Sequence, residues 1–199
     1  MEKDQNNGVV RKKRRLQELL LDYMHDIVFL LAIMLLVFVL VFRVVVVSGP
    51  SMKTTLVDGD YLIVLSSALA GDPEPGDIIV ASKADFKDGE PIIKRVIATE
   101  GQVVDIDFAT GIVTVDGVVL DEPYVKDGTK LYEGVDFPLT VDEGCLFVMG
   151  DNRNQSKDSR DPDIGLIDER QVLGHAIFLV WPGTDGGQTD RDFGRIGVP

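Results

Sequence analysis

Lys94 is the residue whose surroundings point most directly to chemistry. It lies in the segment "PIIKRVIATEG", where Ile and Val residues on either side make a run that is apolar on both faces. A strand of this kind is usually buried on both sides, which would remove Lys94 or Arg95 from water. Desolvation favours a neutral amine, and a neutral amine can accept the proton of a serine hydroxyl. The local sequence also allows Lys94 to reach solvent at an exposed strand end.

Ser51 offers a hydroxyl at an abrupt change in the sequence. In "VVVVSGPSMKTTLVDGD", residues 44–60, an apolar run turns into Ser, Gly, Pro and Ser. Serines are common, and a hydroxyl becomes a nucleophile only beside a group that takes its proton. Together with Lys94, Ser51 would give the Ser-Lys form of nucleophilic catalysis.

A third polar cluster is "MGDNRNQSKDSRD", residues 149–161. Its side chains include Asp151, Asn152, Arg153, Ser156, Asp158, Ser159 and Arg160. Such a loop can hold itself together through Asx turns and Arg-carboxylate pairs while offering hydroxyls to a neighbouring site. A solvated surface loop is the alternative.

The composition argues against a metal, a cofactor or nucleic acid. Cys145 is the single cysteine, and only His25 and His175 accompany it, so the sequence provides no zinc cluster. Residues 1–26 carry six Lys and Arg against five acids, and the remaining residues carry fourteen against twenty-eight. No basic stripe is available to neutralise phosphates, so we expect no nucleic acid partner. We also expect no metal and no cofactor.

The elements that must position these residues begin with an apolar helix. Residues 27–42, "IVFLLAIMLLVFVLVF", contain no charge and predict a single transmembrane helix. "RKKRR" at 11–15 places the N-terminal segment 1–26 in the cytoplasm and the chain from residue 43 outside. A buried core helix and a cleaved signal peptide are the alternatives. Ser51 follows Phe42 by nine residues, so an extended connection would hold it within about 30 Å of the helix.

Residues 43–182 predict an all-β domain. Short Val- and Ile-rich runs alternate with Gly, Pro and Asp, which is typical of strands and turns. Asp116-Gly117 in "VTVDGVVL" predicts a two-residue hairpin turn. A small β insertion is expected at about 104–142, and residues 183–199 are expected to form a flexible tail.

Taken in this order, the three motifs resemble those of bacterial type I signal peptidases. The family pattern Gly-x-Ser-Met-x-Pro-Thr-Leu falls on residues 49–56, with Thr54 where proline is usual. "KRVI" at 94–97 is similar to the block that holds the family's general-base lysine, and "GDNRNQSKDSR" at 150–160 to its Gly-Asp-Asn-Arg block. The resemblance implies a mainly β catalytic domain of the type shared with self-cleaving repressors, behind one N-terminal transmembrane helix.

The resemblance also implies a role for each matching residue. Ser51 would be the nucleophile and Lys94 the general base, with Ser156 orienting the lysine amine. The loop that carries Ser156 would be braced by Asp151, Asp158 and Arg160. The backbone N–H of Ser51 would form part of the oxyanion hole. Gly49 stands where some relatives contribute a serine hydroxyl as a second donor, and proline at position 54 would have fixed the backbone φ.

The expected substrate is the signal peptide of an exported preprotein at the cell membrane. Val45 and Val47 share one face of a strand, and with Met52 and Ile93 they could wall shallow apolar pockets. The resemblance implies small residues, typically alanine, at the first and third positions before the cut. The alternative from a different class is a membrane-anchored β-domain that binds exported proteins without cutting them.

Overall fold

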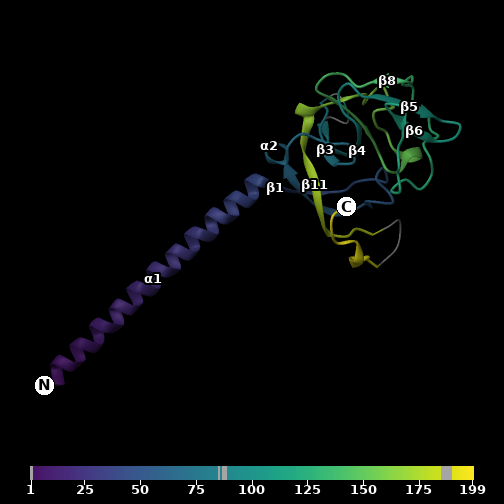
Figure 1. Cartoon of the computed structure of the whole chain (residues 1–199). Helices are drawn as coiled ribbons and strands as arrows, with labels where there is room; N and C mark the ends of the chain where they lie inside the picture. The colour runs from purple at the N-terminus through teal and green to yellow at the C-terminus, as the bar shows by residue number, and fades with distance from the viewer. Residues whose placement is uncertain (1, 85, 87–88, 185–189) are drawn as a thin grey trace. The chain divides into compact units, whose positions relative to one another are not determined.

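The computed structural model describes residues 2–84, 86, 89–184 and 190–199, with side chains from residue 19 onward. The chain divides into two units, a helical one that ends at Val41 and a β-rich one from Phe42 to Pro199 (Figure 1). Each unit is described on its own below.

The helical unit is one helix, α1 (Glu2–Val41). Its segment Leu19–Val41 has 23 residues, and the most apolar 18-residue window within it has a mean hydropathy of 2.7 and no buried residue. At 1.5 Å per residue this segment extends about 35 Å, which is long enough to cross a bilayer. The sequence predicts 27–42 for this span, so the observed apolar segment starts earlier and ends one residue sooner. Phe42 instead opens a strand, because the β-branched residues that follow it favour extended backbone.

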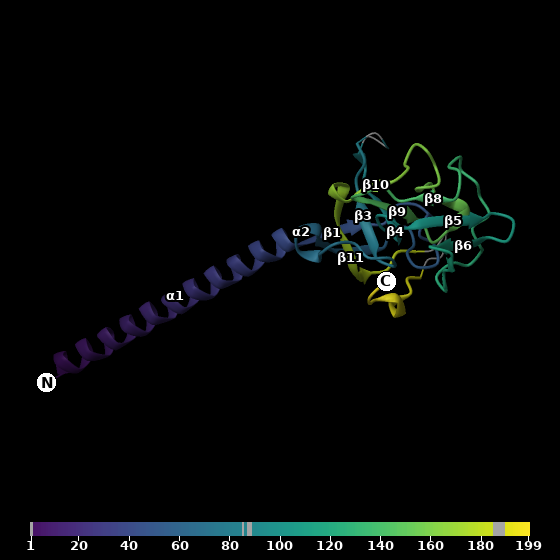
Figure 2. The same cartoon turned by 45° about the horizontal axis from the view of Figure 1, so that its top comes forward.

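The β-rich unit contains two antiparallel sheets, which confirms the mainly β fold (Figure 2). The larger has the strand order β1-β2-β11-β3-β4-β9-β10. Its strands are β1 (Phe42–Val46), β2 (Tyr61–Ser66), β3 (Ile78–Ala81), β4 (Ile92–Ala98), β9 (Cys145–Met149), β10 (Ile167–Asp168) and β11 (Val172–Trp181). The smaller sheet, in the order β7-β6-β5-β8, has β5 (Val103–Asp107), β6 (Ile112–Val115), β7 (Val118–Val119) and β8 (Leu139–Thr140). A short helix, α2 (Ser67–Ala70), and 3-10 turns at Arg153–Gln155, Glu169–Gln171 and Phe193–Arg195 complete the described elements.

The smaller sheet falls within the range in which the sequence predicts a β insertion. Its β6–β7 hairpin turns at Asp116 and Gly117, with φ values of 52° and 78°. Two successive positive φ values are those of a type I′ turn, so the predicted hairpin is confirmed.

Strand β4 lies between β3 and β9, and all seven of its residues are buried. Ile93 packs into one core cluster with Val47 and Met52. Ile92 packs into a second cluster, and Ile97 belongs to a third cluster shared with the smaller sheet. Three separate cores around one strand explain why the segment "IIKRVIA" is apolar on both faces.

The end of the chain, which the sequence predicts as a flexible tail, contacts strand β11. In the described segment 190–199, Phe193 packs edge-on against Trp181 with ring centroids 5.3 Å apart. Leu179 and Gly197 exchange backbone hydrogen bonds of 2.7 and 3.2 Å. The backbone hydrogen bonds do not depend on side-chain type, so the low apolar content of the segment gave no sign of them. Residues 185–189 lie outside the described part of the chain.

Candidate active site

Ser51 lies in the turn between β1 and β2. The turn is closed by backbone hydrogen bonds from Lys53 N to Pro50 O at 3.0 Å and from Leu56 N to Met52 O at 2.9 Å. Gly49 enters the turn with φ of +88°, a conformation that glycine adopts without steric cost. The backbone therefore folds back on itself, and Ser51 is the second residue after Gly49.

Lys94 reaches Ser51 from the centre of β4. Its Nζ donates to Ser51 Oγ at 2.9 Å and to the carbonyl oxygen of Ile93 at 3.1 Å. Only 5% of the residue is exposed, which confirms the predicted burial and contradicts the alternative of a solvent-exposed strand end. The two residues are 43 positions apart in the chain, and the antiparallel sheet brings them together.

An apolar cleft of about 410 Å³ lies beside this contact. It runs between the end of β1 and the segment that leads to Lys94. Its lining contains Ser51, Lys94 and all four predicted pocket residues: Val45, Val47, Met52 and Ile93. Ser48 and Glu90 also line it, although neither is among the pocket residues predicted from the sequence.

Ser156 lies in the loop after β9 and is 2% exposed. Its hydroxyl donates to the Lys157 carbonyl oxygen at 3.4 Å, so the predicted orientation of Lys94 by Ser156 stays a prediction. Gly150 separates Ser156 from the Ser51 turn. A Cβ at position 150 would stand 2.3 Å from Ser156 Oγ and 2.4 Å from the Ser51 carbonyl oxygen. The absence of a side chain at this position therefore lets the two segments approach.

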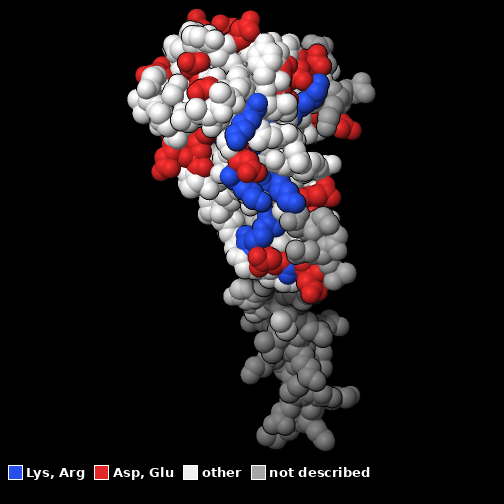
Figure 3. Space-filling model, turned by 90° about the vertical axis from the view of Figure 1, so that its right-hand side faces the viewer, with Lys and Arg blue, Asp and Glu red and all other residues white. Residues whose placement is uncertain are grey.

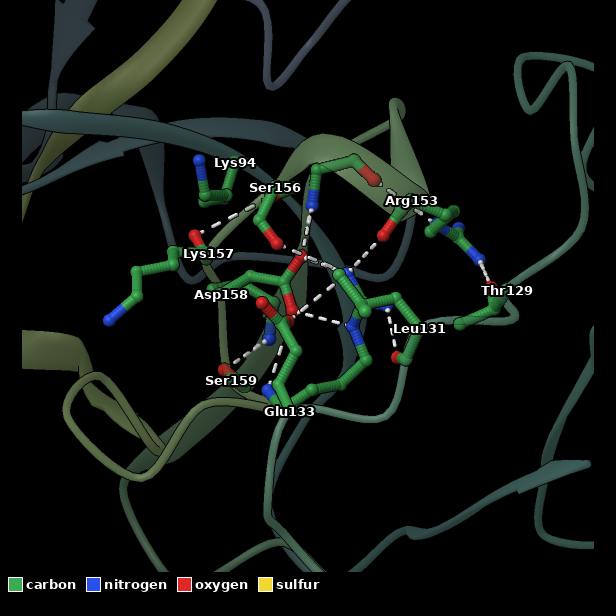
Figure 4. Close-up of polar contacts among 12 residues, drawn as sticks. Lys94, Thr129, Leu131, Glu133, Arg153, Ser156, Lys157, Asp158 and Ser159 are labelled. Atoms are coloured by element: carbon green, nitrogen blue, oxygen red, sulfur yellow. Dashed lines mark hydrogen bonds and ion pairs between the residues drawn. The ribbon is translucent and has the colours of Figure 1, made fainter. Parts of the chain in front are cut away.

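Asp158 and Arg160 form a buried bidentate pair within the same loop. Arg160 Nε and Nη2 each donate to Asp158 at 2.8 Å, and both side chains are fully buried. Arg160 Nη2 also donates to the Arg153 carbonyl oxygen at 2.7 Å, while Asp158 accepts from Gly150 N at 2.9 Å. Figure 4 shows Asp158 at the centre of these contacts. The pair thus ties the two ends of the loop that carries Ser156.

Asp151 is bound by Arg95, the residue next to Lys94. Arg95 Nε and Nη2 donate to the two carboxylate oxygens at 2.8 and 2.7 Å. Burial alone would lower the pKa of Arg95, but the hydrogen bonds and charge of Asp151 outweigh it and raise the pKa. Thr55 Oγ1 donates to the same carboxylate at 2.5 Å. Asp151 therefore connects β4 to the turn that carries Ser51.

Two further groups near this loop have shifted pKa values. Burial, followed by the negative charge of Glu122, raises the pKa of Tyr124 to about 12. The guanidinium of Arg95 lies over the Tyr124 ring, 4.1 Å from its centroid. Burial and then the charge of Asp158 raise the pKa of Glu133 to about 7.

Asn152 is a site residue whose role was not predicted from the sequence. Its backbone N donates to the Ser51 carbonyl oxygen at 3.0 Å, and its Nδ2 donates to the Pro50 carbonyl oxygen at 3.0 Å. From the sequence, Arg95 is predicted only to be buried. Its carboxylate partner was not predicted, although the fork of its guanidinium suits a carboxylate. The motif "GDNR" contains Asp151, which binds Arg95, and Asn152, which binds the Ser51 turn. Only the folded sheet places this motif against Ser51.

Thr54 has a backbone conformation that proline cannot adopt. Its φ is +109°, whereas the proline ring fixes φ near −65°. Thr54 Oγ1 donates to the Tyr124 carbonyl oxygen at 2.5 Å, and Thr55 N donates to Met52 O at 3.1 Å. From the sequence, the loss of proline predicts a less constrained turn. In the structure a side-chain hydrogen bond to a distant loop fixes it instead.

A second, polar cleft of about 550 Å³ begins where the Ser51 turn continues into Lys53 and Thr54. Charged residues of both signs line it, among them Lys126, Asp127, Asp192 and Arg195. Figure 3 shows that Lys and Arg side chains form a band on one face of the molecule, with acidic side chains beside it. Successive residues of one turn therefore line an apolar and a polar cleft.

Comparison with known proteins gives one consistent family. The family model described as signal peptidase, peptidase S26, matches residues 20–181. Signal peptidase I from Bacillus licheniformis is 34% identical over 179 residues, covering 86% of this chain and 94% of that protein. Signal peptidase I T from Bacillus subtilis is 32% identical over 197 residues, covering 95% and 100%. A probable signal peptidase I-1 from Synechocystis is 37% identical over 150 residues, covering 71% and 72%.

Proposed function

Since this chain belongs to the signal peptidase family, peptidase S26, we propose that Ser51 and Lys94 carry out its reaction. The observation that supports this is the 2.9 Å contact between Lys94 Nζ and Ser51 Oγ, made by a lysine that is 5% exposed. A domain that only binds exported proteins has no need for such a pair. Family membership and this contact together favour the peptidase over the non-catalytic scaffold.

The reaction begins with transfer of the Ser51 hydroxyl proton to the neutral amine of Lys94. Ser51 Oγ attacks the carbonyl carbon of the scissile peptide bond, and a tetrahedral intermediate forms. When its C–N bond breaks, the Lys94 ammonium protonates the leaving amine, and an acyl ester remains on Ser51. Lys94 then takes a proton from water, the resulting hydroxide attacks the ester, and Ser51 regains its proton.

Burial prepares Lys94 for this role. An ammonium group loses hydration when it is buried, so burial favours the neutral form that can accept a proton. The carbonyl oxygen of Ile93 accepts a hydrogen bond from Nζ at 3.1 Å and helps to aim the amine. Ser156, buried in the neighbouring loop, is the proposed second orienting group.

The negative oxygen of the tetrahedral intermediate needs hydrogen-bond donors. The backbone N–H of Ser51 is the first proposed donor, and one such donor lowers the barrier by about 3 kcal/mol. Glycine at position 49 has no hydroxyl to offer. Ser48 lines the same cleft, so its hydroxyl is the candidate for the second donor.

The apolar cleft sets the proposed substrate preference. Its walls are Val45, Val47, Met52 and Ile93. Membership of the signal peptidase family favours small side chains at the first and third positions before the cut. β1 is the terminal strand of the larger sheet, with β2 as its neighbour. An extended substrate segment can pair with this edge through backbone hydrogen bonds, while alternate side chains enter the cleft.

The membrane arrangement completes the proposal. The segment Leu19–Val41 is long and apolar enough to span a bilayer once. The basic residues at 11–15 favour a cytoplasmic N-terminus, which places the β-rich unit on the outer side. Protease added outside sealed cells should digest the β-rich unit and leave a tag at residue 1 protected. The reverse pattern would contradict the orientation.

The assignment is tested with variants of the two reacting residues. Ser51→Ala and Lys94→Ala should each abolish cleavage of a preprotein with an Ala-x-Ala site, while the full-length protein stays folded in detergent. Lys130→Ala, which changes an exposed lysine, is the matched control and should cleave at the normal rate. Full activity in either reacting-residue variant would refute the assignment. A metal chelator should leave cleavage unchanged, because no step uses a metal.

A further inference from the structure

We propose that the C-terminal segment 190–199 positions the nucleophile turn, residues 50–60, and that Arg195 is the residue through which it acts. The inference rests on the proposed function, because it concerns the placement of Ser51. The segment lies beyond residues 20–181, the part of the chain matched by the family model.

Arg195 contacts the nucleophile turn at two places. Its Nη1 and Nη2 donate to the two carboxylate oxygens of Asp60 at 3.0 and 2.6 Å. Its Nη2 also donates to the carbonyl oxygen of Thr55 at 3.0 Å. One guanidinium thus joins the middle of the turn, four residues after Ser51, to its end.

Asp60 passes this restraint on to the residues that flank Ser51. Its side chain is fully buried and also accepts from Val57 N at 2.8 Å and Gly183 N at 2.6 Å. Its backbone carbonyl accepts from Val47 N at 2.8 Å, four residues before Ser51. Arg195 therefore supports both arms of the loop that presents the nucleophile.

The C-terminal segment is itself fixed to the sheet near Arg195. Gly197 pairs with Leu179 on β11, and Phe193 packs on Trp181 at the end of the same strand. Arg191 donates to the Pro182 carbonyl oxygen at 2.6 Å and lies 5.7 Å from the centre of the Trp181 ring. The guanidinium of Arg195 thus extends from a part of the chain that is anchored independently of the nucleophile turn.

Removing Arg195 leaves a buried carboxylate without its cation. A buried charge that loses its partner draws in water or moves toward solvent. Either response displaces the turn that Asp60 organises, and with it Ser51 relative to Lys94. A shift of about 1 Å at a reacting group can reduce the rate of the chemical step about 100-fold. Most residues that line the apolar cleft lie outside the nucleophile turn. The affinity for substrate should therefore change less than the rate of the chemical step.

The test compares Arg195→Met with Arg191→Met in the full-length protein in detergent, using cleavage of an Ala-x-Ala preprotein. We expect kcat of Arg195→Met to fall at least about tenfold while KM changes less than about twofold. Arg191→Met is the matched control, since it alters the same segment without contacting the nucleophile turn, and it should keep both constants. Wild-type kcat in folded Arg195→Met would overturn the proposal.

Two further measurements separate positioning from general loss of structure. Free guanidinium ion should restore part of the kcat of Arg195→Ala at a concentration that leaves the wild type unchanged. If Arg195→Met is unfolded at the assay temperature, Arg195→Gln, which also removes the cation, replaces it, and an unchanged kcat in that folded variant would overturn the proposal. Ser51→Ala reports on the proposed function separately. Cleavage by that variant would refute the reacting pair whatever the Arg195 variants do.

Discussion

An alanine at position 150 would place one methyl group between the two segments that meet at the reacting pair. Its Cβ would lie 2.3 Å from Ser156 Oγ, 2.4 Å from the Ser51 carbonyl oxygen and 2.6 Å from Ser156 Cβ. Non-bonded heavy atoms prefer about 3.5 Å, so one or both segments must move by about 1 Å.

Hydrogen bonds hold both the Ser51 carbonyl and Gly150 itself in place. The Ser51 carbonyl oxygen accepts from Asn152 N at 3.0 Å, and Gly150 N donates to the buried carboxylate of Asp158 at 2.9 Å. Overpacking of this kind lowers the free energy of unfolding by about 1–3 kcal/mol. A displacement of about 1 Å between Ser51 and Lys94 should lower kcat about 100-fold.

The assay measures kcat, KM and the thermal unfolding midpoint of Gly150→Ala. Gly144→Ala is the matched control, because its φ of +65° makes alanine strained while its Cβ meets no atom within 4 Å. Both variants should be less stable than the wild type, but only Gly150→Ala should lose the chemical step. A folded Gly150→Ala protein with wild-type kcat would show that the close approach of Ser51 and Ser156 is not needed for catalysis.

Three further predictions concern the groups around the site. Arg95→Met leaves the buried carboxylate of Asp151 without its bidentate partner and should lower the free energy of unfolding by about 3–5 kcal/mol, measured by urea denaturation; an unchanged midpoint would contradict this. The pKa of Glu133 is raised from 4.5 to about 7, so the folded protein keeps a proton that the unfolded chain releases, and stability should fall as the pH rises through this range. Glu133→Gln should flatten that decline, and an equal slope in the variant would assign it to other groups. Ile93→Ala enlarges the apolar cleft and should raise kcat/KM for preproteins with leucine in place of alanine near the cut, while lowering the free energy of unfolding by about 2–4 kcal/mol; unchanged selectivity would remove Ile93 from the pocket.

The buried arginines explain why the loop after β9 holds one geometry. Arg95, Arg153 and Arg160 each bind a carboxylate, and their partners are Asp151, Glu122 and Asp158. Taking such charges out of water costs about as much as their attraction returns, so these pairs add little net stability. Breaking one is costly, however, because a buried charge is left alone. The network therefore favours one arrangement of the loop over others, as a positioned reacting group requires.

The sequence alone determined the features that depend on neighbours in the chain. The uncharged run after residue 26 predicts the apolar helix, because length and composition decide whether a helix can cross a bilayer. Asp116-Gly117 predicts its hairpin, because positive φ is a local property of these two residues. The apolar surroundings of Lys94 predict its burial, since a strand without a polar face has no side to turn toward water.

Only the tertiary structure decided which distant residues meet. The order β1-β2-β11-β3-β4-β9-β10 places strands from both ends of the domain side by side, and no local pattern encodes that order. It brings Lys94 to Ser51 and Arg95 to Asp151, and it sets Asn152 against the Ser51 carbonyl. The role of Arg195 was hidden for the same reason. Its segment is poor in apolar residues, and the two partners of Arg195, Asp60 and Thr55, lie more than a hundred residues earlier in the chain.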